Sequence, residues 1–116
     1  MLTLDPPGSP GKPVIDDYDN KSATLKWTKP ENDGGRPITN YIIEMKDKLS
    51  PNWVEVGKTE DNKPEFTVED LKEKNIYQFR VRGVNKAGIG APSEPTDSHL
   101  CKHKNRKLEY SFLCKT

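Results

Sequence analysis

Apolar and polar residues alternate strictly over residues 77–82, Tyr-Gln-Phe-Arg-Val-Arg. Successive side chains of a β-strand point to opposite faces, so this period of two predicts a strand with one buried and one solvated face. Residues 23–28 and 40–46 alternate in the same way, with Ile42 as the exception on an otherwise polar face. Such strands must bury their apolar faces against another layer, which makes facing β-sheets the expected architecture.

Four further short strands are expected at residues 14–18, 53–56, 66–68 and 93–100, which gives about seven in all. Proline, glycine, asparagine and aspartate cluster between the strands, and these residues favour turns. The ten prolines and eight glycines also oppose helix formation. A parallel sheet would need crossover helices, and no helical stripe is present. We therefore predict an all-β fold, a seven-stranded antiparallel immunoglobulin-like β-sandwich.

The chain of 116 residues has the size of one domain. Residues 1–11 are rich in proline and glycine, the composition of an extended linker, and residues 12–101 are assigned to the folded domain. Residues 102–116 form a basic tail that we expect to be disordered. Cys101 and Cys114 both fall at this end, so the domain is expected to have no thiol in its core.

The distribution of charge argues against nucleic-acid and membrane partners. The net charge is +1, but residues 1–100 carry 14 basic and 17 acidic residues, and binding to phosphates needs a basic face. No apolar segment approaches the ~20 residues of a membrane span, and the N-terminus has no signal-peptide pattern. We therefore expect a cytoplasmic protein that binds neither nucleic acid nor membrane.

The patterns that would indicate catalysis or metal binding are weak. No serine or cysteine stands beside a histidine and an acid in a nucleophile motif. His99, Cys101 and His103 alternate, and Cys114 could add a fourth zinc ligand, but this spacing is not a common zinc pattern. We expect no enzymatic activity, no cofactor and no metal.

Several residues stand at the order and spacing of a known family: Pro13, Trp27, Tyr41, Leu71, Tyr77, Phe79, Val81, Asn85 and Gly88. Over roughly residues 10–100 the chain resembles a fibronectin type III domain. The resemblance implies a structural core that includes Trp27, Tyr41, Leu71, Tyr77 and Phe79. It also implies a tyrosine corner, in which the Tyr77 hydroxyl bonds a backbone group, expected to be an acceptor, in the preceding loop. Gly83 departs from the family, which usually has alanine there.

Two loops indicate which group of fibronectin type III domains the chain resembles most. Residues 33–38, Asp-Gly-Gly-Arg-Pro-Ile, and residues 85–95, Asn-Lys-Ala-Gly-Ile-Gly-Ala-Pro-Ser-Glu-Pro, are similar to modules of the giant muscle proteins titin, twitchin and projectin. This similarity implies a non-catalytic, force-bearing spacer and docking module in a sarcomeric domain array. The implied partners are neighbouring domains and thick-filament proteins such as myosin, and the domain itself is expected to be monomeric.

The same two loops supply the candidate partner contacts, which are Asp33, Gly34, Gly35, Arg36, Asn85, Lys86, Gly88 and Gly90. Trp53 is a further apolar residue that either covers the core or contacts a partner, and we favour the core. The alternative function is a ligand-binding module of a cell-surface receptor or adhesion protein. That alternative requires a signal peptide upstream and a glycan on Asn20, which begins an Asn-Lys-Ser sequon.

Overall fold

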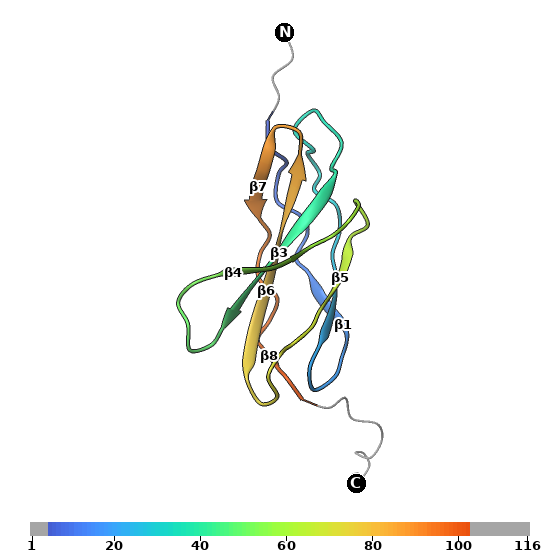
Figure 1. The fold of residues 1–116 in the computed structure, drawn as a ribbon. Coiled ribbons are helices and arrows are strands. Elements are labelled where there is room, and N and C mark those ends of the chain that lie inside the picture. The colour runs from blue at the N-terminus through green and yellow to red at the C-terminus, as the bar shows by residue number, and fades with distance from the viewer. Residues whose placement is uncertain (1–4, 103–116) are drawn as a thin grey trace.

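The computed structural model describes residues 5–102, which form two facing antiparallel sheets with no helix among them (Figure 1). The strands are β1 (Val14–Tyr18), β2 (Ala23–Lys26), β3 (Asn40–Asp47), β4 (Val54–Lys58), β5 (Glu65–Val68), β6 (Ile76–Asn85), β7 (Gly88–Pro92) and β8 (His99–Leu100). One sheet has the order β1-β2-β5, and the other has the order β4-β3-β6-β7 with β8 also paired to β6. The predicted antiparallel sandwich is confirmed.

The longest ladder joins β3 to β6 and runs without a shift from the pair Asn40–Val84 to the pair Asp47–Tyr77. Along β6 buried and half-buried residues alternate over the whole strand. This is the pattern expected of a strand with one face on the core, as the alternation of residue types predicted. The ladder therefore fixes which side chains of the second sheet point outward.

The core lies between the two sheets. Trp27 and Leu71 are 6% and 5% exposed, Tyr77 is 4% exposed, and Tyr41 and Phe79 are fully buried. Trp27 follows β2 rather than lying in it, and its backbone N–H donates to the Pro64 carbonyl over 3.1 Å. Its ring meets the Tyr41 ring edge-on with centroids 5.2 Å apart, a favourable arrangement for two aromatic rings.

The prediction of a last strand at residues 93–100 was wrong over most of its length, because only His99–Leu100 (β8) is a strand there. β7 (Gly88–Pro92) lies instead in a segment expected to be a loop, so the fold has eight strands rather than seven. Pro92 and Pro95 have no N–H, and Pro92 ends β7. Between β7 and β8, the hydroxyl of Ser93 accepts the Val81 N–H over 3.0 Å, and the hydroxyl of Thr96 accepts the Phe79 N–H over 3.1 Å. Two side chains thus replace carbonyls that a regular ladder would supply.

The proline-rich lead-in is packed against the domain, which differs from the extended linker that its composition indicates. The N–H groups of Asp5, Gly8 and Gly11 donate to the carbonyls of Gly34, Asn32 and Thr28, respectively. Pro7 and Pro10 are buried. The prolines keep this segment extended, and the glycines between them supply the donors and allow close approach.

Cys101 is fully buried in the core cluster, so the expectation that the domain has no thiol was wrong. Its N–H donates to the Asn75 carbonyl over 2.9 Å, and its carbonyl accepts the Lys74 N–H over 2.6 Å. These bonds tie the end of the described chain to the loop before β6. Cys114 and the rest of the expected tail after Lys102 lie outside the described residues.

Candidate interaction site

Asn85 is an internal brace at the end of the molecule where the lead-in begins, and it is only 5% exposed. Its amide nitrogen donates to the carbonyls of Asp5, at 2.9 Å, and Asp33, at 2.7 Å. Its amide oxygen accepts the N–H groups of Ala87, at 2.8 Å, and Gly88, at 3.2 Å. The side chain thus joins the lead-in, the loop after β2 and the β6–β7 turn, and it is not available to a partner.

Gly34 and Gly90 are buried beneath the lead-in. A β-carbon on Gly34 would stand 2.0 Å from the Asp5 carbonyl oxygen, and one on Gly90 would stand 2.1 Å from that of Pro7. Gly34 also has a φ of +76°, which favours glycine. Both glycines permit close backbone packing and offer no surface for docking.

The remaining candidates stay at the surface. Asp33, Gly35, Arg36 and Lys86 are exposed, and Gly88 is half-buried. Arg36 and Lys86 line one hollow of about 300 Å³ together with Pro37 and Thr39. The structure therefore brings two cations from the two predicted loops to one place, where an anionic group of a partner would be attracted.

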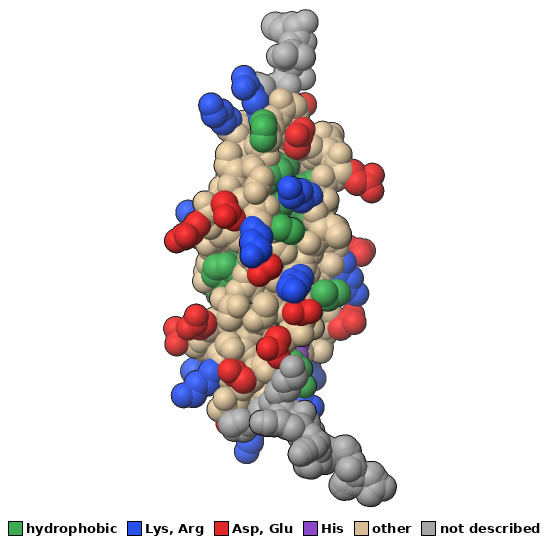
Figure 2. Space-filling view, turned by 90° about the vertical axis from the view of Figure 1, so that its right-hand side faces the viewer, with side chains coloured by type: hydrophobic (Ala, Val, Ile, Leu, Met, Phe, Trp, Pro, Cys, Tyr) green, Lys and Arg blue, Asp and Glu red, His purple; other side chains and the backbone are tan. Residues whose placement is uncertain are grey.

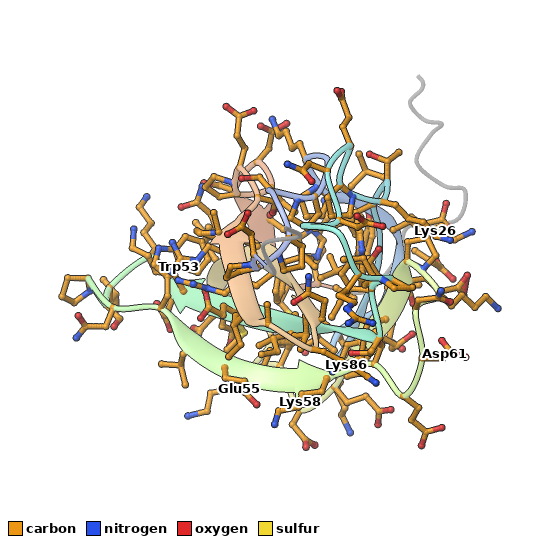
Figure 3. The ribbon with its side chains drawn as sticks, turned by 90° about the horizontal axis from the view of Figure 1, so that it is seen from above. Lys26, Trp53, Glu55, Lys58, Asp61 and Lys86 are labelled. Atoms are coloured by element: carbon orange, nitrogen blue, oxygen red, sulfur yellow. The ribbon has the colours of Figure 1, made fainter. Side chains whose placement is uncertain are left out.

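A second polar cluster lies on the outer face of the β4-β3-β6-β7 sheet and was not among the predicted sites. One oxygen of Glu44, on β3, accepts hydrogen bonds from Nε of Arg80, at 2.6 Å, and Nε of Arg82, at 3.2 Å. Arg80 also lies over the ring of Trp53, 4.5 Å from its centroid. Figure 3 shows Glu55 and Lys58 pointing away from β4 on one side of the molecule, with Trp53 at its edge.

Trp53 therefore stacks on a cation and is not one of the residues packed against the core. Burial disfavours the charged form of Glu44, but the hydrogen bonds and charges of Arg80 and Arg82 outweigh it, so the pKa of Glu44 lies below its ordinary value. The alternation of β3 and β6 places these charges opposite one another. That signal could have found the cluster from the sequence.

The turn before β6 is held by the hydroxyl of Tyr77, which accepts the backbone N–H of Lys72 over 3.0 Å. The side-chain amide of Asn75 donates to the same hydroxyl over 3.3 Å. The backbone partner is therefore a donor and not the expected acceptor. Lys74, in the same turn, has a φ of +75°, a conformation more typical of glycine.

The residues of the weak zinc pattern are only partly described. His99 and Cys101 are placed, whereas His103 and Cys114 lie outside the described residues. Burial, and then the charge of Lys102, lower the pKa of His99. Burial, and then the charges of Asp19 and Glu73, raise the pKa of the Cys101 thiol. Over residues 5–102 no group of three potential ligands stands close enough together to hold a metal ion.

The surface seen in Figure 2 carries basic and acidic side chains side by side, and its hydrophobic side chains are scattered. Within the described part of the chain, no helix has the length and apolar character to cross a membrane. On the β1–β2 turn, Asn20 is half-buried, and its carbonyl accepts the Cys101 thiol over 3.2 Å.

Comparison with known proteins identifies the architecture. Residues 7–99 match the family described as Fibronectin type III domain. The chain belongs to this family. The match begins within the lead-in, in agreement with the packing of that segment against the fibronectin type III core.

Muscle proteins are among the relatives of this fibronectin type III domain. It is 39% identical over 84 residues to M-protein of striated muscle from Gallus gallus, which covers 72% of this chain and 6% of M-protein. It is 37% identical over 110 residues to the titin homolog of Caenorhabditis elegans, which covers 94% of this chain and 1% of that protein. A crystal structure of domains A168-A170 from titin is 38% identical with a TM-score of 0.81, over 85% of this chain and 33% of that one. The chain thus spans only a small part of each of these proteins.

Proposed function

We propose that this chain is a non-catalytic module of a sarcomeric protein, acting as a spacer, a docking surface and a force-bearing unit in an array of domains. The observation that carries the proposal is the position of the two ends of the described chain at opposite ends of the sandwich (Figure 1). Domains joined end to end through such termini form a line, and tension then passes through every module. The similarity to parts of M-protein and a titin homolog supports the sarcomeric setting.

The array neighbours and thick-filament proteins such as myosin are the proposed protein partners, as the family resemblance implies. The proposed contact is the hollow lined by Arg36 and Lys86. Apart from Asp33, the other candidates at this end of the molecule are either internal or uncharged. Two cations whose side-chain ends make no hydrogen bond or ion pair within residues 5–102 favour a carboxylate on the partner. The module itself is proposed to be monomeric.

Expression of the tagged chain in striated muscle cells tests the proposed sarcomeric location. The expected result is a striped pattern in register with the thick filaments, weakened when Arg36 and Lys86 are both changed to glutamate. The control is Lys29→Glu together with Lys48→Glu, two exposed lysines outside the hollow. A diffuse distribution, or a secreted chain that shifts in mobility on glycosidase treatment, would contradict the sarcomeric proposal and favour the receptor alternative.

A further inference from the structure

The outer face of the β4-β3-β6-β7 sheet presents an arginine with unused donors. Among the described residues, Arg80 donates a hydrogen bond only through Nε, to Glu44. The Trp53 ring covers one face of its guanidinium. The Arg80 side chain is 20% exposed. A guanidinium fixed on its Nε edge and on one face keeps its two terminal nitrogens oriented, which lowers the entropy lost when a carboxylate binds them.

The charges of this face do not balance. Strand register places Lys58 beside Ile42 and Glu55 beside Glu44 on the outer side, and alternation along β3 adds Lys46. With Arg80 and Arg82 the outer face has four basic and two acidic side chains, a balance of +2. The described residues as a whole carry 15 basic and 17 acidic side chains, a balance of −2. The positive charge is therefore concentrated on one face.

Among the described residues, the hydrogen bonds of this cluster do not use every donor of its two arginines. Here two guanidinium groups share a single oxygen of Glu44, and Arg82 satisfies a further donor on the Gly90 carbonyl over 3.2 Å. Glu55 contacts Lys58 only at 3.9 Å. Within residues 5–102, the donors that remain unused include the terminal nitrogens of Arg80, whose guanidinium lies over the Trp53 ring.

We propose that this face, centred on Arg80 and Trp53, docks an acidic segment of a partner protein, whose carboxylates bind the terminal nitrogens of Arg80 and the ammonium groups of Lys46 and Lys58. This inference rests on the proposed docking role and assigns it a second surface, separate from the Arg36–Lys86 hollow. Glu44 and Glu55 interrupt the positive charge of this face. A peptide whose carboxylates are spaced to meet Arg80, Lys46 and Lys58 therefore fits better than the continuous run of phosphates in a nucleic acid.

A titration of the ¹⁵N-labelled chain with a short glutamate-rich peptide, followed by NMR, tests the proposal. We expect the indole N–H signal of Trp53 and the Nε–H signals of Arg80 and Arg82 to shift on binding. Arg80→Gln should weaken binding about 10-fold, since a charge-assisted hydrogen bond is lost. The double variant Lys46→Gln with Lys58→Gln should also weaken peptide binding. It leaves the bonds of Glu44 to Arg80 and Arg82 intact, so it still tests the proposal if Arg80→Gln does not fold.

Glu44→Gln separates docking from a purely structural role. It should lower stability, because Arg80 and Arg82 would then bond a neutral amide oxygen in place of a carboxylate. It should nevertheless tighten peptide binding several-fold, because the amide oxygen still orients Arg80 while a competing negative charge is gone. Unchanged binding in Glu44→Gln and Arg80→Gln would overturn the proposal, as would a DNA duplex that binds as well as the peptide. Arg36→Gln with Lys86→Gln should leave this binding unaltered. The test therefore distinguishes a failure of this proposal from a failure of the proposed contact at Arg36 and Lys86.

Discussion

At the scale of single residues, the Tyr77 hydroxyl shows how one polar atom can hold a turn. It accepts the Lys72 N–H, and its ring is 4% exposed. Tyr77→Phe should lower the free energy of unfolding by about 1 to 2 kcal/mol, since a partly buried N–H loses its acceptor. Urea denaturation measures this change. Tyr18→Phe is the control, because among the described residues the Tyr18 hydroxyl makes no hydrogen bond. Equal stability of Tyr77→Phe and the native chain would contradict the stabilising role of the Tyr77 hydroxyl.

His99 makes the stability of the C-terminal end of the described chain depend on pH. Its Nε2 atom is buried without a hydrogen-bond partner among residues 5–102, and its ring meets Tyr18 edge-on at 4.8 Å. Because burial and then Lys102 lower its pKa below the ordinary value of 6.5, the unfolded chain binds the proton more readily than the folded one. The stability that His99 contributes is therefore present above about pH 6.5 and is lost as the pH falls towards its folded pKa.

His99→Phe keeps a ring against Tyr18 but cannot titrate. Between pH 7 and pH 5 we expect the native chain to lose more stability than this variant, as measured by urea denaturation at each pH. The comparison stays above the range in which Glu44 is protonated, since the pKa of Glu44 is lowered. Parallel pH profiles for the two chains would show that the buried imidazole does not control the stability of this end.

At the scale of elements, the lead-in is the segment whose behaviour the sequence predicted least. Its proline and glycine content is typical of a linker, whereas its backbone hydrogen bonds and the close approach of Gly34 and Gly90 to its backbone show that it packs. Gly90→Ala should cost about 1 to 3 kcal/mol, because the new methyl group would meet the Pro7 carbonyl. Gly83→Ala is the matched change, since its methyl group would stand 3.4 Å from Pro7, an ordinary contact, and should be neutral or slightly stabilising.

Removal of residues 1–10 tests whether the cost of Gly90→Ala arises from the lead-in. In the shortened chain the cost should largely disappear, as a double-mutant cycle would measure. A cost that persists without the lead-in would place the effect in the β6–β7 hairpin and contradict the packing described here.

Element type was predictable where side chains alternate. The ends of β1 (Val14–Tyr18) were predicted as well, but those of β7 (Gly88–Pro92) and β8 (His99–Leu100) were not. The two-faced patterns of β3 and β6 come directly from the requirement that one face is buried. The gap between β7 and β8 depends on the hydroxyls of Ser93 and Thr96, which bond to β6. Such short polar side chains can bond to the backbone in several kinds of structure, so the sequence does not show which bond they make. The bonding partners of Asn85 could not be predicted either. It was predicted to contact a partner protein, but it is internal.

At the scale of the whole molecule, both ends of the described chain are anchored by hydrogen bonds. Residues 5–11 bond to the loop at residues 28–34. At the other end, β8 pairs with β6, and Cys101 bonds to the loop at residues 74–75. Since the ends lie at opposite ends of the fold (Figure 1), tension applied between them would load these bonds.

The central claim is that the domain bears force as one unit, and stretching single molecules of a tandem array tests it most directly. Each module should unfold in one event that releases roughly 90 residues, about 300 Å of contour length at ~3.4 Å per residue. The account predicts a distinct force peak for every such increment. Extension without peaks, or increments much shorter than this length, would contradict it.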